Sequence, residues 1–159
     1  MGKNDHSTER QTFIAACDAK VKLVRVEAGL TQDAMAHALG LSKKTLVDIE
    51  KGRRTLGWTG SVALCLVFGD SEVIAGTFGG TPVDLIQTAA FAGQPVHRRR
   101  VTGSPTWWTA VMENDRYILQ QNVISQHYRI ITHDKTRIAS AFDLDELLPI
   151  FNHPLTEGQ

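Results

Sequence analysis

The strongest constraint on the fold of this chain is a pair of short helical segments around a single glycine, Gly40. Thr31 and Ser42 each precede one segment, and a hydroxyl at that position accepts a hydrogen bond from a backbone N–H that the helix leaves unpaired. Gly40 follows the first segment, where a left-handed residue commonly ends a helix. The sequence therefore predicts two short helices, one that begins at Thr31 and one that begins at Ser42, joined by a tight turn.

The two faces of these helices differ in polarity. Apolar residues at helical spacing predict a shared core, and they are Met35, Leu39, Leu46 and Ile49. The exposed side of the second helix keeps Lys43, Lys44, Val47, Asp48 and Lys51. The whole chain has a net charge of zero, but residues 42–54 hold an excess of cations, namely Lys43, Lys44, Lys51, Arg53 and Arg54 against Asp48 and Glu50. A local basic face is typical of proteins that bind nucleic acid.

This stretch resembles the Cro and phage-repressor family of helix-turn-helix regulators, also called the XRE family. The resemblance rests on Arg25, Gly29, Leu30, Thr31, Gln32, Ala36, Leu39, Gly40, Leu41, Ser42, Thr45, Leu46, Ile49, Glu50, Gly52 and Arg53. The family pattern covers roughly residues 14–78. It implies a bundle of five helices in which residues 42–51 form the recognition helix, the one that enters the major groove of DNA.

The resemblance also implies roles for individual residues. Contacts to base edges are expected from Lys43, Lys44, Val47 and Asp48. Contacts to phosphate are expected from Gln32, Thr45, Lys51 and Arg53. Arg25 and Glu50 are expected to form an inward-facing ion pair that sets the angle of the recognition helix. For the two lysines the alternative is an ordinary solvated surface.

Further periodicity divides the chain into two domains and a linker. Helices are predicted from residue 7 or 8 to residue 28 and over residues 62–68, 71–79 and 81–91, so that residues 1–92 form the five-helix bundle plus an extra helix. Residues 93–106 are rich in Gly and Pro and are predicted to be a linker. Its run Arg98-Arg99-Arg100 could touch DNA, but a solvated charged linker is the favoured interpretation.

Residues 107–159 are predicted to form a small α+β domain. Three segments rich in β-branched and aromatic residues, 117–122, 127–132 and 137–142, predict a three-stranded antiparallel meander. Alternation predicts one face with Tyr117, Leu119, Tyr128, Ile130, Ile138 and Phe142, and another with Gln120, Arg129 and Arg137. Asp143 is predicted to cap a closing helix, and Trp107-Trp108 to start a short helix or an edge strand.

Several classes of protein are disfavoured by composition. No apolar run is long enough to span a membrane, and the N-terminus lacks the apolar core of a signal peptide, so a cytoplasmic location is expected. Cys17 and Cys65 are expected to be buried thiols. The histidines, cysteines and carboxylates match no motif for a metal site, a cofactor or a catalytic nucleophile, so no enzymatic activity is expected.

The sequence thus favours a sequence-specific DNA-binding transcription regulator. A repressor that acts as a homodimer on a two-fold operator is the first hypothesis, with residues 93–159 supplying much of the dimer interface. The alternative is an antitoxin-like or complex-forming DNA-binding protein. In that case the C-terminal domain would bind a protein partner or a small effector.

Overall fold

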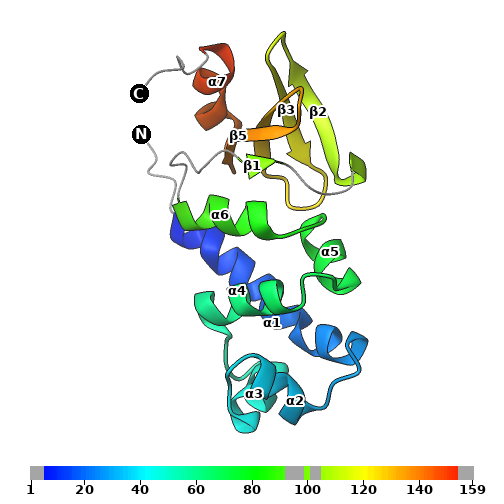
Figure 1. Ribbon diagram of the computed structural model, residues 1–159. Coiled ribbons are helices and arrows are strands. Elements are labelled where there is room, and N and C mark those ends of the chain that lie inside the picture. The colour runs from blue at the N-terminus through cyan, green and yellow to red at the C-terminus, as the bar shows by residue number, and fades with distance from the viewer. Residues whose placement is uncertain (1–5, 92–98, 101–104, 154–159) are drawn as a thin grey trace. The chain divides into compact units, whose positions relative to one another are not determined.

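The computed structural model describes residues 6–91, 99–100 and 105–153 (Figure 1). The chain forms two compact units, Met1–Val83 and Asp84–Gln159. In the described residues the first unit is helical, and the second contains a sheet. None of the helices in the described ranges is both long and apolar enough to cross a membrane.

The described residues of the first unit form five helices. In chain order they are α1 (His6–Glu27), α2 (Gln32–Ala38), α3 (Lys43–Glu50), α4 (Gly57–Val67) and α5 (Glu72–Phe78). Helix α1 packs against α3, α4 and α5, and its buried face carries Phe13, Ile14, Cys17, Val21 and Val24. The thiols of Cys17 and Cys65 are free and buried, with their sulfur atoms 3.8 Å apart.

Helix α4 begins five residues before its predicted start at Val62. The N-cap residue Leu56 makes no side-chain cap, but Thr55 Oγ1 accepts from the backbone N–H of Gly57 at 3.0 Å. Asp18 of α1 also accepts a hydrogen bond, from the backbone N–H of Leu56 through Oδ1, at 2.8 Å. A carboxylate from a distant part of the chain satisfies a backbone donor at this helix start, and a local sequence pattern does not reveal such a contact.

The sheet of the second unit is larger than predicted. Its strands are β1 (Arg99–Arg100), β2 (Trp108–Glu113), β3 (Tyr117–Asn122), β4 (Tyr128–Thr132) and β5 (Thr136–Ala141), all antiparallel in the order β1-β5-β4-β3-β2. The short helix η1 (Pro105–Trp107) precedes β2. The predicted three-stranded meander is therefore wrong in number, because it contains only β3, β4 and β5. Strand β2 is an exposed edge strand without the alternation that marks a half-buried strand, and β1 lies within the predicted linker.

The apolar core of the second unit lies on one face of the sheet. One face packs Tyr117, Leu119, Ile130, Ile138 and Ala141 against Leu147 and Phe151 of α7 (Leu144–Asn152). The prediction was wrong for Phe142, which lies beside the ring of His127 instead of in this cluster. An irregularity between β4 and β5 shifts the register after Ile130, and a bulge of this kind interrupts the alternation of side chains along a strand.

The boundary between the two units in the sequence falls at the start of helix α6 (Val83–Phe91). We predicted it as the extra helix of the N-terminal domain, which we expected to end at residue 92. Its residues from Asp84 onward group with the second unit. Asp84 and Gln87 accept hydrogen bonds from Arg137 of β5, which explains this grouping.

Candidate nucleic-acid interface

Two capping hydroxyls fix the ends of the helix pair α2–α3. Thr31 Oγ1 accepts from the backbone N–H of Ala34 at 3.2 Å, and Ser42 Oγ accepts from that of Thr45 at 3.1 Å. Between the helices Gly40 has φ +68°, a left-handed conformation that a side chain would disfavour. The backbone N–H of Leu41 then returns to the carbonyl of Ala36 at 2.8 Å. The predicted turn is therefore present, with the left-handed glycine at its centre.

The buried sides of α2 and α3 orient the pair. Met35 and Ala36 of α2 and Leu46 and Ile49 of α3 are all buried. Their burial leaves Lys43 and Lys44 exposed at the N-terminal end of α3. In helix-turn-helix proteins this end of the second helix contacts base edges in the major groove.

The residues predicted to contact bases differ in their surroundings. Lys43 Nζ lies 2.7 Å from Asp33 Oδ2, and both side chains are more than half exposed. An exposed ion pair of this kind contributes little stability and opens easily. Lys44 is exposed, whereas Val47 and Asp48 are half-buried, and Asp48 Oδ1 lies 4.0 Å from Arg53 Nη1.

The residues predicted to contact phosphate also differ in their surroundings. Lys51 and Arg53 are exposed just after α3. The hydroxyl of Thr45 bonds to Ser42 Oγ at 2.9 Å and accepts from Arg54 Nη1 at 3.3 Å. We did not assign Arg54 to the interface from the sequence. Its contact with Thr45 brings another cation to the N-terminal end of α3.

Glu50 is the centre of a polar network that joins three helices. Arg25 Nε donates to Glu50 Oε1 at 2.5 Å and Arg25 Nη2 to Oε2 at 3.2 Å. Gln32 Nε2 also donates to Oε2, at 2.9 Å, while Arg25 Nη1 donates to the carbonyl of Leu30 at 3.0 Å. The side chains of Arg25 and Glu50 are only 15% and 4% exposed. Arg25 and Glu50 therefore face inward, and the network ties α1 and α2 to α3.

The ionisation of Glu50 depends on these partners. Burial acts to raise the pKa of Glu50, but the bonds from Arg25 and Gln32 and the nearby positive charges outweigh burial. As a result, the pKa of Glu50 lies below its ordinary value. Glu50 is therefore an anion at neutral pH. The hydrogen bond from Gln32 Nε2 to Glu50 also orients the side chain of Gln32. Nε2 carries a second N–H, which could donate to a phosphate oxygen.

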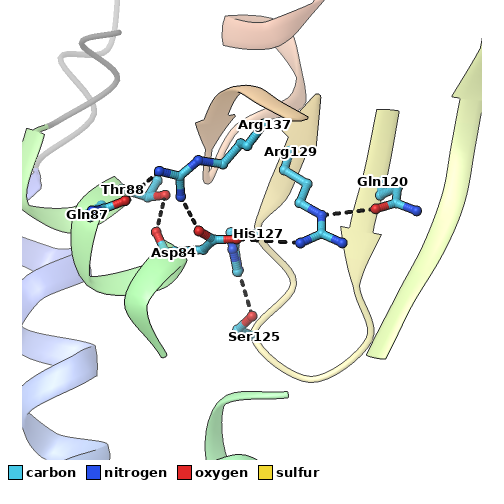
Figure 2. A network of polar contacts seen from close by, with 8 residues as sticks. All are labelled: Asp84, Gln87, Thr88, Gln120, Ser125, His127, Arg129 and Arg137. Carbon is cyan, nitrogen blue, oxygen red and sulfur yellow. Dashed lines mark hydrogen bonds and ion pairs between the residues drawn. The ribbon is translucent and has the colours of Figure 1, made fainter. Parts of the chain in front are cut away.

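A second polar group of residues, which we call the arginine cluster, lies in the C-terminal unit (Figure 2). It comprises Asp84 and Gln87 of α6, Gln120 of β3, Arg129 of β4 and Arg137 of β5. The sequence predicted that the two arginines share a face of the sheet, but it gave no signal that a carboxylate from α6 would join them. In the sequence, Asp84 lies 45 positions from Arg129 and 53 positions from Arg137.

Within the described ranges no group of three or more His, Cys, Asp or Glu side chains could hold a metal ion.

Comparison with known proteins agrees with the geometry of the N-terminal unit. A family model described as Helix-turn-helix matches residues 21–57. No curated protein and no solved structure was found to match the chain. The matched segment contains α2, the turn at Gly40, α3 and the network around Glu50. Residues 21–57 are thus an XRE-type helix-turn-helix, which supports a role in binding DNA.

Proposed function

We propose that the protein is a sequence-specific DNA-binding transcription regulator that reads its operator with α3. The observation that carries this proposal is the matched helix-turn-helix, in which α3 buries Leu46 and Ile49 and leaves Lys43 and Lys44 exposed at its N-terminal end. A lysine in the major groove donates to guanine O6 and N7. Val47 would contact a thymine methyl group, and Asp48 would accept from cytosine N4.

The phosphate contacts of this proposal come from the flanks of α3. Gln32 begins α2, where unpaired backbone N–H groups favour an anion. Thr45, Lys51 and Arg53 would hold the DNA backbone beside the groove. Such contacts position the protein on any duplex, whereas the base contacts select the sequence.

The regulator acts in this proposal as a cytoplasmic homodimer without catalytic activity, and it represses by occluding the promoter. Two recognition helices would enter successive major grooves about 34 Å apart. Joining two half-site readers raises affinity through effective concentration. We assign the dimer contact to the C-terminal unit, in which β2 is an exposed edge strand. Light scattering on the full chain, together with DNA titration of a fragment of residues 1–92, tests this assignment; a dimeric fragment with undiminished affinity contradicts it.

Selection of bound duplexes from a random pool tests DNA recognition itself. Double replacement of Lys43 and Lys44 by alanine should then lower operator affinity by about 1–3 kcal/mol per lost base contact while random-duplex affinity falls less. Gln32→Ala should weaken both kinds of binding. Lys20→Ala on α1 is the matched control, since Lys20 lies outside α2 and α3. Unchanged discrimination in the double variant rejects α3 as the reading element.

A second candidate function is an antitoxin-like or complex-forming DNA-binding protein. The observation in its favour is the exposed apolar edge strand β2, where Val111 and Met112 are 43% and 39% exposed. Apolar side chains on a sheet edge are typical of surfaces that pair with another chain. Co-purification of the full chain from its native cell distinguishes the two candidates, because a bound second protein is expected only for the complex-forming one.

A further inference from the structure

The arginine cluster buries more positive charge than negative charge. The side chains of Arg129 and Arg137 are 6% and 3% exposed, and both bind the carboxylate of Asp84. Burial lowers the pKa of Arg129 to about 10 even though Asp84 acts in the opposite direction. One carboxylate thus serves two guanidinium groups. A structural ion pair would match each buried cation with an anion, because an unmatched buried charge is costly.

The described residues engage only part of the guanidinium group of Arg129. A guanidinium group carries five N–H donors, and Arg129 Nε donates to Gln120 Oε1 at 2.9 Å while Nη1 donates to Asp84 Oδ2 at 3.4 Å. Among the described residues none accepts from its Nη2. The ring of Trp108 covers one face of the guanidinium group at 3.6 Å from the ring centre. A further acceptor would therefore approach in the plane of the guanidinium group, where its N–H bonds point.

His127 provides an independent sign that a polar partner is absent. Its Nδ1 lies 2.7 Å from Ser125 Oγ, but its buried Nε2 has no hydrogen-bond partner within the described part of the chain. Burial, with the charges of Arg129 and Arg137, lowers the pKa of His127 to about 3, so the ring is neutral. When Ser125 donates to Nδ1, the neutral ring carries its hydrogen on Nε2 and is a donor.

His127 and Arg129 lie close to each other. Arg129 belongs to β4, and His127 comes immediately before this strand. The rings of His127 and Trp108 meet edge to face with centres 5.0 Å apart, and Arg129 stacks on that same Trp108. Figure 2 shows Arg129 on the sheet joined to Asp84, which belongs to α6. Arg129 and His127, whose Nε2 lacks a partner among the described residues, therefore share one aromatic neighbour.

We propose that Arg129, Arg137 and His127 bind the oxyanionic group, carboxylate or phosphate, of a small ligand. One added negative charge would balance the two guanidinium groups and Asp84. A carboxylate or phosphate also presents several oxygens in the plane where an arginine donates, and arginine is well suited to that geometry. The site lies in the unit without the helix-turn-helix, so its test does not depend on DNA binding.

Titration of the full chain followed by NMR of the arginine side-chain N–H groups tests this site. The probes are sodium phosphate and sodium acetate, each compared with sodium chloride at equal ionic strength to remove screening effects. We expect saturable shifts of Arg129 and Arg137 signals with at least one probe. A response to phosphate alone assigns a phosphate-bearing ligand, and a response to acetate alone assigns a carboxylate. No saturable shift with either probe overturns the proposal.

Two matched pairs of variants locate the binding. Arg129→Lys keeps the charge but loses the planar fork, and it should weaken binding about tenfold, whereas Arg116→Lys at an exposed position should not. Equal affinity in these two variants overturns the proposal. If Arg129→Lys fails to fold, Asp84→Asn replaces it. Asp84→Asn removes the carboxylate that competes for the two guanidinium groups. This variant should therefore bind the probe that gave a response more tightly than the exposed control Asp115→Asn does, and an unchanged affinity contradicts the site.

Discussion

Loss of the carboxylate of Glu50 is expected to destabilise the N-terminal unit strongly. In Glu50→Ala the guanidinium group of Arg25 loses both bonds to carboxylate oxygens but keeps its bond to the carbonyl of Leu30. Removal of one partner from a buried ion pair typically costs about 3–5 kcal/mol. Because the side chain of Arg25 is 15% exposed and can turn toward water, we expect the lower end of that range.

For a unit of this size, the loss of unfolding free energy corresponds to a fall in melting temperature. For a domain of 60–100 residues, 1 kcal/mol lowers the melting temperature by about 4–8 °C, so a loss of about 3 kcal/mol predicts a fall of about 12–24 °C. Far-ultraviolet circular dichroism measures it well, because five helices belong to this unit. The transition of the sheet-containing unit should not move, since the two units need not unfold together.

Lys51→Ala is the matched control for this experiment. Lys51 follows Glu50 in the chain but is exposed, and a substitution at such a position usually changes stability by less than about 0.5 kcal/mol. Glu50→Gln should fall between the two, because its carbonyl oxygen still accepts one bond from Arg25. Equal melting temperatures for Glu50→Ala and Lys51→Ala would refute the inward orientation of Glu50.

Three further predictions follow from the same contacts. Asp33→Asn frees Lys43 from its exposed ion pair and should tighten binding to duplex DNA a few-fold at low salt, in a gel-shift titration; unchanged affinity means that Lys43 does not reach DNA. Since folding lowers the pKa of Glu50 from its ordinary 4.5, its stabilising contribution is present above that value and is lost as pH falls through the lower folded pKa. Melting curves should show that acidification lowers the stability of Glu50→Gln less than that of the unsubstituted protein. An identical loss of stability contradicts this linkage. Leu119→Ala, at a fully buried position of the sheet core, should cost about 2–5 kcal/mol in the C-terminal unit alone by calorimetry, and a shift of the helical transition speaks against independent units.

The sequence alone determined most of the local structure. Thr31, Gly40 and Ser42 defined the ends of α2 and α3, because capping and left-handed turns depend on only a few neighbouring residues. Alternation along β3 placed Leu119 and Gln120 on opposite faces of the sheet for a similarly local reason. These patterns are short-range, so the helix-turn-helix and three of the strands could be predicted without the fold.

Tertiary structure decided the contacts between segments that are distant in the sequence. Asp18 supports the start of α4 from another helix, and Asp84 brings two arginines from different strands together. The exposed edge strand β2 likewise acquires its place only by pairing with β3. A carboxylate or an arginine looks solvated in any local pattern, because its burial depends on whether a partner of opposite charge arrives from elsewhere in the chain.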